Sequence, residues 1–439
     1  MPPIRRAVRR GGRIGGLAVA VAGLLAAGFG PGSAPAAAAR PDAAPAATVP
    51  AVAPAPPTAA ATVPATPAPA APAATPAGTA TATDLTLRYG ATGHSWRTEI
   101  RSPGSSYVKV HFAALKLVAG DRVTVASPDR REVHTYYADR SRGSDYTEHG
   151  GPGFAALSID GDTAVVTLHA RGARDADRLA RRGYGVEIDR YFRGYTATER
   201  AAKQPGSRSV CGGDARRDVA CYQTSHPVEY ARGNAVARQL LRGVGHCTAW
   251  RVGNTNRMLT NQHCLENAAD LRASEFQFDY QCATCGGNNP RPGTKVSGQQ
   301  LIRLSGLNEL DYALFSVNSF ESIQQFGTLY LDPRTPRAGE RIYIPGHGDT
   351  KPKRLSLYEE SASGATCKID VVSSGVNTGY RCDTSGGNSG SPVLAGSSHK
   401  VIALHHLGGC PNWGTRISLV YDQIKGDIDN TETARGTAG

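Results

Sequence analysis

All nine cysteines of this 439-residue chain lie after residue 208, which confines covalent cross-linking to one region. They stand at positions 211, 221, 247, 264, 282, 285, 367, 382 and 410. Cysteines gathered in one segment of an exported chain indicate disulfides, and an odd number leaves at least one thiol over. The sequence therefore predicts a disulfide-stabilised domain that begins near residue 209.

The pair Cys282-x-x-Cys285 raises the alternative of a zinc site. A tetrahedral zinc site needs a second Cys or His pair at matching spacing, and none is nearby. We expect neither a metal nor a cofactor.

The chain opens with the pattern of an export signal. Five Arg residues precede the apolar stretch Ile14–Gly30, and small residues follow from Ser33 to Ala39. This order is typical of a secretory signal peptide, whereas a membrane anchor needs about 20 apolar residues. Residues 1–39 are predicted to be that signal, so the mature protein is expected to be extracellular and to meet a membrane only through it.

Three segments with different composition precede the cysteine-bearing domain. Residues 40–83 are almost wholly Ala, Pro and Thr, which predicts a disordered linker. Residues 84–195 carry short alternating runs between turns, typical of an antiparallel β-sandwich, and would be a pro- or accessory domain. The runs are Tyr107–Phe112, Val123–Val125, Val133–Tyr136 and Ala164–Leu168. Residues 196–208 are predicted to be a second linker and residues 431–439 a disordered tail.

Three short strings carry the chemistry. They are Leu259–Cys264, which contains His263; Leu310–Phe315, which contains Asp311; and Gly386–Pro392, which contains Ser389. A hydroxyl becomes a good nucleophile when a base takes its proton, and His suits that role near neutral pH. A carboxylate then fixes the His tautomer. We therefore predict a catalytic triad of these three residues.

The turn around the predicted nucleophile also suits an oxyanion. The backbone N–H groups of Gly387 and Ser389 can donate to the oxygen of the attacked carbonyl. Glycine at 387 lets that peptide turn inward without steric cost.

The order of the triad along the chain separates the folds that carry one. Asp311 follows His263 by 48 residues, and Ser389 follows Asp311 by 78. This is the order of chymotrypsin and not of subtilisins or α/β-hydrolases. An α/β-hydrolase is further excluded because Ser391 stands where its nucleophile motif has Gly.

On these strings, residues 209–430 resemble the trypsin/chymotrypsin serine peptidases, most closely the bacterial secreted glutamyl and lysyl endopeptidases. The loop Gly386–Pro392 has the glutamyl endopeptidase form. Similarities to the lysyl endopeptidases are Cys211, Cys221, Asp279-Tyr280-Gln281 before Cys285, and His405 with Gly408-Gly409-Cys410.

This resemblance implies an all-β fold, a chymotrypsin-like double β-barrel preceded here by the antiparallel β-sandwich domain. His263 and Asp311 would come from the first six-stranded barrel and Ser389 from the second. Two stretches have helical periodicity, Ala235–Leu241 and Leu419–Ile428, and the second matches the family's C-terminal helix.

The resemblance and the local spacing also predict the bridges. Cys247 would pair with Cys264 beside His263, and Cys367 with Cys382 before the nucleophile loop. Cys211–Cys410 is implied by the lysyl endopeptidases, and Cys221 would pair with Cys285, leaving Cys282 free.

Activation is expected to differ from that of the animal members. They carry Asp before the nucleophile, which pairs with a freed N-terminal amine, whereas this chain has Asn388 and no Ile-Val-Gly-Gly start near residues 205–212. Removal of residues up to about 208 would instead uncover the cleft of a zymogen. The β-sandwich could block or chaperone the protease, or be a retained binding module.

The residues of the specificity pocket give two conflicting signals. Asp383 lies six residues before Ser389, where trypsins carry the carboxylate that selects Arg or Lys. Thr384 and His405, or His406 if the alignment is shifted by one, match positions at which glutamyl endopeptidases hold a substrate carboxylate. Two carboxylates about 4 Å apart repel by roughly 4 kcal/mol at an effective dielectric near 20. We therefore expect cleavage after Arg or Lys, with Glu as the alternative if Asp383 points away or is neutralised.

The sequence as a whole predicts a secreted serine endopeptidase that acts on proteins or peptides through an acyl-enzyme. A formal net charge of +12, without a long Lys/Arg run, argues against nucleic acid as a partner, and we expect a monomer. The alternative is a non-catalytic secreted binding protein with a protease-like domain.

Overall fold

The computed structural model describes residues 74–90, 96–172, 175–203, 209–360 and 363–432. The predicted signal peptide, most of the first linker and most of the tail lie outside these residues. None of the helices in these ranges is long and apolar enough to cross a membrane.

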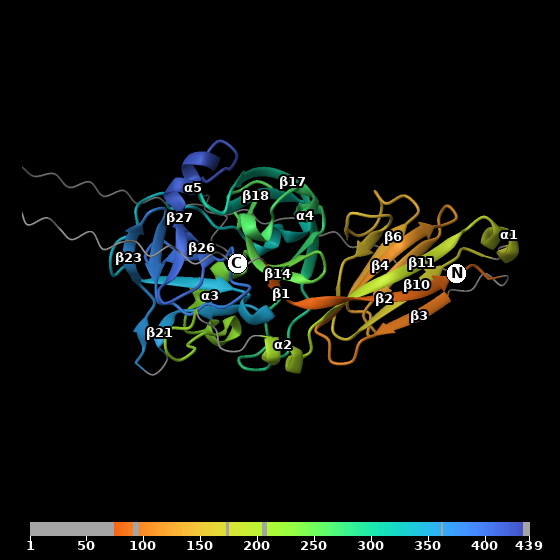
Figure 1. Cartoon of the computed structure of the whole chain (residues 1–439), viewed down its shortest axis with the longest axis horizontal. Helices are drawn as coiled ribbons and strands as arrows, with labels where there is room; N and C mark the ends of the chain where they lie inside the picture. Colours follow the sequence, from red (N-terminus) through yellow and green to blue (C-terminus); the bar gives the residue numbers. More distant parts are fainter. Residues whose placement is uncertain (1–73, 91–95, 173–174, 204–208, 361–362, 433–439) are drawn as a thin grey trace, which may run out of the picture. The chain divides into compact units, whose positions relative to one another are not determined.

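Residues 78–194, called the β-domain below, form two antiparallel sheets that share one hydrophobic core (Figure 1). The core includes Val110 and Phe112 from one sheet and Val125 and Val166 from the other. The larger sheet has β2 (Gly78–Leu87), β11 (Gly185–Gly194), β4 (Tyr107–Lys116), β8 (Phe154–Ala156) and β7 (Tyr146–Thr147), with β9 (Ile159–Asp160) beside β4. The smaller has β3 (Trp96–Arg101), β10 (Thr163–His169), β5 (Arg122–Ala126) and β6 (Val133–Tyr137), and helix α1 (Ala176–Arg181) precedes β11.

Order begins earlier than the sequence predicted, because residues 74–83 of the expected linker are structured. β1 (Thr75–Pro76) and β2 both lie in that Ala/Thr-rich stretch. Side chains of β2 alternate between buried or half-buried and exposed, and its backbone pairs with β11. Alternating Thr and Ala provide little apolar surface, so the pairing partner and not local composition decides the conformation.

The second predicted linker also contains an ordered element, helix α2 (Ala197–Lys203). Thr196 and Glu199 form a reciprocal capping box, since the Thr196 N–H donates to Glu199 (2.8 Å) and the Glu199 N–H donates to the Thr196 hydroxyl (3.2 Å). This arrangement satisfies two otherwise unpaired donors at a helix start. The linker expectation was therefore wrong for residues 197–203.

The first half of the following domain is a closed barrel of six antiparallel strands, with β1 added beside β14. Its interior contains Met258, Phe276, Val296 and Phe315. The strands are β13 (Val236–Leu241), β14 (Gly245–Arg251), β15 (Met258–Thr260), β16 (Ser274–Phe278), β17 (Thr294–Ser305) and β18 (Tyr312–Val317). The helix expected at Ala235–Leu241 is instead β13, which pairs on both sides and is buried on both faces. Two-sided burial removes the alternation that would have identified a strand.

The second half is an eight-stranded antiparallel sheet with its own core, which includes Ile344, Val393 and Ile402. Its order is β12 (Arg217–Asp218), β20 (Arg354–Ser356), β19 (Ile342–Gly346), β25 (Pro392–Ala395), β26 (Val401–Leu407), β27 (Asn412–Arg416), β24 (Asn377–Tyr380) and β23 (Ile369–Ser374). A bridge between Arg341 and Lys368 joins the region before β19 to that before β23. The sheet thus curls back toward itself as a second barrel.

Shorter elements complete the domain. The helices are α3 (Pro227–Gly233), α4 (Ala268–Arg272) and the C-terminal α5 (Ile417–Ile424), which overlaps the helix predicted there. Short 3₁₀ segments cover Val219–Tyr222, Gln262–Cys264, Phe320–Phe326 and Gly348–Thr350. In addition, β21 (Tyr358–Glu360) pairs with β22 (Ala365–Thr366).

Four disulfides connect distant parts of this domain. They join Cys211 to Cys410, Cys221 to Cys285, Cys247 to Cys264 and Cys367 to Cys382. Cys282 is a buried free thiol, and Cys285 is occupied by its bridge. The Cys-x-x-Cys pair is therefore not arranged as a zinc ligand pair.

Candidate active site

Two neighbouring strands of the first barrel bring His263 and Asp311 together. Thr260 at the end of β15 lies opposite Ala313 near the start of β18. His263 follows the first strand by three residues and Asp311 immediately precedes the second. Antiparallel pairing therefore places both residues at the same edge of the barrel.

The two side chains form a tight pair. His263 Nδ1 lies 2.7 Å from Asp311 Oδ2, and the His263 N–H donates to Oδ1 at 3.0 Å. Asn261 donates to the Asp311 carbonyl at 2.9 Å. Burial alone would raise the pKa of Asp311, but hydrogen bonds from the neighbouring imidazoles outweigh it and hold this pKa below its usual range. Asp311 is thus an ionised acceptor that fixes the orientation of the His263 ring.

A second histidine, which the sequence did not single out for this role, also contacts the carboxylate. His406 Nδ1 lies 3.2 Å from Asp311 Oδ2, and its Nε2 lies 2.9 Å from Asn377 Oδ1. Successive side chains of a strand face opposite ways, so His406 turns toward the triad and His405 away from it. The His-His pair in the sequence was the available signal.

Ser389 is provided by the second barrel, in the turn before β25. Its carbonyl accepts a hydrogen bond from the Thr248 N–H of the first barrel at 2.9 Å, and the next residue, Gly390, donates to the His405 carbonyl at 2.9 Å. These two bonds hold the turn between the barrels. His263 Nε2 is buried and has no hydrogen-bond partner among the described residues, so the proton-accepting atom is not engaged elsewhere. Hydrogen bonds between base and nucleophile are often long before substrate binds.

The backbone before Ser389 needs glycine at 387. Its φ is +100°, and a Cβ there would lie 2.6 Å from the His246 ring and 2.7 Å from the His347 carbonyl. Its own carbonyl accepts from Thr248 Oγ1 at 2.8 Å. Within the described part of the chain, no group accepts a hydrogen bond from the N–H of Gly387 or Ser389.

Asp383 is buried and faces the start of the protease domain. Its carboxylate accepts from the Cys211 N–H at 2.9 Å and from the Ala215 N–H at 2.7 Å. Burial raises its pKa. Both oxygens are thus engaged by backbone donors.

The other two expected pocket residues are also held in place. Thr384 Oγ1 donates to Asn412 Oδ1 at 3.0 Å. His405 Nδ1 lies 2.7 Å from the Tyr380 hydroxyl, and burial lowers the pKa of His405 to about 3. His405 is therefore a neutral ring whose Nε2 can carry the proton when the Tyr380 hydroxyl donates to Nδ1.

Arg216 is a buried cation beneath the nucleophile loop, and no motif in the sequence marks it. Its guanidinium donates to Ser385 Oγ, to Asp349 at 3.0 Å and to Asp214 at 2.9 Å. Ser385 opens the turn that leads to Ser389, and its carbonyl accepts from Asn388 N–H at 2.9 Å. Together with the Asp383 contacts, Arg216 fixes the start of the domain under this turn.

The one group of close metal-ligand types found in the described residues is not a metal centre. Ligand atoms of Cys247, His263 and Cys264 lie within 4.8 Å of one another. The two sulfurs, however, are joined in a disulfide, and a metal requires a thiolate.

Two barrels with a His–Asp pair on one and a glycine-flanked Ser on the other define a chymotrypsin-like fold. The family model of the trypsin-like peptidase domain matches residues 247–404, which include all three predicted triad residues. The domain that contains residues 247–404 belongs to the trypsin/chymotrypsin-like serine peptidase family.

Individual relatives extend this match. Secreted RxLR effector protein 73 of Plasmopara viticola is 30% identical over 333 residues, which is 73% of this chain and 79% of that protein. This match is longer than the protease domain and so continues into the part before it. A glutamyl endopeptidase of Staphylococcus epidermidis is 30% identical over 167 residues, 37% of this chain and 54% of that protein. A solved Glu endopeptidase structure covers 51% of this chain and all of its own, with 20% identity and a TM-score of 0.39.

Proposed function

We propose that this chain is a secreted serine endopeptidase, and the observation that carries the proposal is the buried His263–Asp311 pair beside the Ser389 turn. In the reaction, Ser389 Oγ attacks the peptide carbonyl while His263 Nε2 takes its proton. Asp311 stabilises the imidazolium that forms. The N–H groups of Gly387 and Ser389 bind the oxyanion. His263 then protonates the leaving amine, and water hydrolyses the acyl-enzyme.

For the residue before the scissile bond, the geometry favours the acidic alternative over Arg or Lys. Selection of a basic side chain requires a carboxylate that the substrate can reach, whereas Asp383 is fully buried and accepts two backbone hydrogen bonds from the start of the domain. His405, held by Tyr380, offers a neutral N–H donor to a substrate carboxylate. Burial raises the pKa of Asp383, which favours its neutral form, and two backbone N–H groups offset its charge when it is ionised. We therefore propose cleavage after Glu.

Export and synthesis as a zymogen complete the proposal. Support for export comes from the charged and apolar start of the sequence and from four disulfides, which persist in oxidising compartments. The similar effector protein is also named as secreted.

The test is to label the secreted protein with a serine-directed phosphonate, and to measure casein hydrolysis and cleavage of a peptide library. We expect labelling at Ser389, and loss of about 10⁶ in kcat in the Ser389→Ala variant. Cleavage mainly after Arg or Lys would overturn the specificity. Absence of both labelling and hydrolysis would favour a non-catalytic binding protein.

A further inference from the structure

A short stretch that precedes the β-domain lies along the protease barrel. Residues 74–77, the cleft segment below, contain β1, which pairs antiparallel with β14: Thr75 lies opposite His246 and Pro76 opposite Gly245. The Ala77 N–H donates to the Val244 carbonyl at 2.7 Å. Nothing in the composition of this Ala/Pro/Thr-rich region predicted a strand there.

The cleft segment also touches the nucleophile turn. A Cβ built on Gly386 would lie 2.7 Å from Thr75 Oγ1 and 3.5 Å from Thr75 Cβ. Gly386 is three residues before Ser389, and the adjoining Gly387 lies against His246, the pairing partner of Thr75. Thr75 is thus located between the edge of the first barrel and the turn from the second.

The N-terminal end of the cleft segment points toward the triad. From Ala77 back to Ala74, the antiparallel register advances along β14 toward Cys247. Cys247 is bridged to Cys264, which directly follows His263. In the N-to-C direction the segment therefore runs away from the catalytic residues, as does the part of a substrate that follows the scissile bond.

Extended peptides often bind by adding a strand to an exposed sheet edge. We infer that the β-domain is an intramolecular inhibitor, which holds residues 74–77 on the edge of β14 where the part of a substrate after the scissile bond would bind. This inference rests on the proposed function. It assigns an inhibitory function to the β-domain and places the block where the substrate residues after the scissile bond would bind.

The sequence explains why the occupant would block the site and not be cut. No charged residue occurs between positions 43 and 83, so the chain leading into the cleft segment offers neither Glu nor Arg or Lys before a scissile bond. A bound peptide without the required side chain occupies the site unproductively.

Buried ion pairs hold the β-domain on the same barrel. Lys109 of β4 lies 2.7 Å from Glu275 of β16, and the exposed fractions of the two side chains are 0% and 1%. Ser158 donates to the same carboxylate through its hydroxyl and its N–H. A charge buried this completely is stable only with its partner in place.

Charges of opposite sign continue this contact. Lys295 of β17 lies 2.5 Å from Glu132 and 3.2 Å from Asp160, both of the β-domain. Arg238 of β13 and Gln277 of β16 also contact Asp160. The cleft segment is therefore fixed to a body that binds the barrel at several points.

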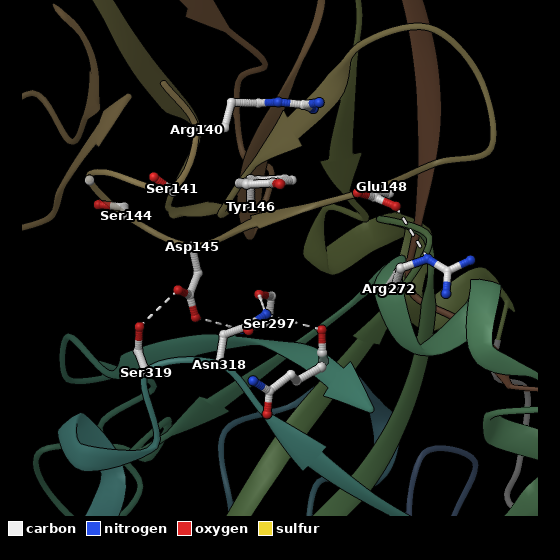
Figure 2. A pocket seen from close by; sticks show the side chains of 13 residues that line it. Arg140, Ser141, Ser144, Asp145, Tyr146, Glu148, Arg272, Ser297, Asn318 and Ser319 are labelled. Atoms are coloured by element: carbon white, nitrogen blue, oxygen red, sulfur yellow. Dashed lines mark hydrogen bonds and ion pairs between the residues drawn. The ribbon is translucent and has the colours of Figure 1, made fainter. Parts of the chain in front are cut away.

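A cavity lies at the edge of this contact and is lined by residues of both the β-domain and the barrel (Figure 2). Asp145 accepts from Ser319 Oγ at 2.8 Å and from the Ser297 N–H at 3.0 Å, and Glu148 pairs with Arg272 at 3.2 Å. Every acidic group at this margin has a partner, so the cavity belongs to the docking contact.

The first experiment weakens the cleft segment in the full chain, with the linker at residues 204–208 uncut as checked by mass. Ala77→Pro removes the hydrogen bond to Val244. The matched control is Thr79→Pro, two residues further on, in the part of β2 that pairs with β11. A tethered segment acts at an effective concentration of about millimolar or more, so we expect about tenfold faster cleavage of a long peptide substrate with Ala77→Pro. The control should stay at the rate of the native chain.

The second experiment locks the segment in place. The separation of 3.5 Å between Thr75 Cβ and a Cβ on Gly386 suits a disulfide, so Thr75→Cys with Gly386→Cys should cross-link on oxidation. We expect the cross-linked chain to cleave the long peptide more slowly than either single variant. Peptide mapping without this cross-link, or a cross-linked chain as active as Gly386→Cys alone, would overturn the inference.

Phosphonate labelling separates this inference from the proposed function. If Ser389 is labelled in every variant while all cleave the peptide equally fast, the inhibitor role is wrong and the peptidase assignment stands. If Ser389 is never labelled, including in Ala77→Pro, the peptidase proposal itself fails.

Discussion

The two large contacts of this molecule differ in chemistry. Between the barrels, Trp250, Leu259 and Leu314 of the first pack in one cluster with Leu394 and Leu404 of the second. Between the β-domain and the first barrel, the buried contact includes ion pairs such as Lys109–Glu275 and Lys295–Glu132. Permanent interfaces resemble a hydrophobic core, whereas separable ones are more polar.

This difference implies different lifetimes for the two contacts. Helix α5 adds Ile417, Val420 and Ile424 to the cluster between the barrels, so separating the barrels would expose a continuous apolar core. Releasing the β-domain would expose charges that water solvates well. The barrels are thus expected to act as one unit, with the β-domain as a removable part.

Asp311→Asn should lower activity strongly and leave both contacts unchanged. Asn preserves the shape of the side chain but favours the wrong tautomer of His263, which costs about 10⁴ in kcat. The measurement is kcat on a peptide substrate, together with thermal unfolding. A variant that retained more than a few per cent of activity would show that the His263–Asp311 pair is not the catalytic one.

Lys109→Met should have the opposite effect. It should weaken binding of the β-domain to the protease barrel and leave the catalytic triad unchanged. It leaves Glu275 buried without its closest cation, a change that costs about 3–5 kcal/mol. After cleavage of the linker at residues 204–208, gel filtration should find the β-domain dissociated from the protease.

The matched control replaces both partners, Lys109→Met with Glu275→Met. Because an apolar pair leaves no uncompensated charge, docking should recover toward that of the native chain. Equal docking of the native chain and Lys109→Met would mean that the ion pair does not hold the domain.

The contrast between the contacts also explains what the sequence could reveal. Each triad residue lies in a short sequence motif that can be recognised without knowledge of the rest of the fold. The β13 strand was mistaken for a helix because both its faces are buried. Thr75 and His246 are paired although they lie far apart in the sequence. The Ala/Pro/Thr-rich stretch around Thr75 has no alternating apolar pattern that would predict a strand. Ion pairs such as Lys109–Glu275 likewise depend on two domains meeting, which no local pattern encodes.

Acid should weaken the contact between the β-domain and the barrel only at a pH lower than the usual pKa of a carboxyl group. Burial alone would raise the pKa of Glu275, but Lys109 and Lys295, with a hydrogen bond from Ser158, lower it to about 2. Arg238 also faces this carboxylate. Because this pKa is depressed, the stabilisation is complete above about pH 4.5 and is lost as pH falls through about 2.

Gel filtration of the linker-cleaved protein across pH 7 to 2 tests this expectation. Docking should persist at pH 4 and disappear toward pH 2, while Lys109→Met should already be dissociated at pH 7. Loss of docking between pH 6 and 5 would instead point to histidine and contradict the role of Glu275.

Substitution of Arg216 should have the smallest effect of these variants. It tests whether the nucleophile turn is held in place by Arg216 and not by a freed N-terminus. The Arg216 guanidinium reaches Ser385 and Asp349 together, and Lys, a point charge, cannot match that fork. Arg216 positions the turn and does not touch substrate. Arg216→Lys should therefore lower kcat about tenfold, which raises the activation free energy by about 1.4 kcal/mol, with little change in KM. Arg354→Lys, a neighbouring arginine that also contacts Asp214 and Asp349, is the matched control and should keep kcat. A rise in KM alone would mean that Arg216 shapes the substrate pocket and not the nucleophile turn.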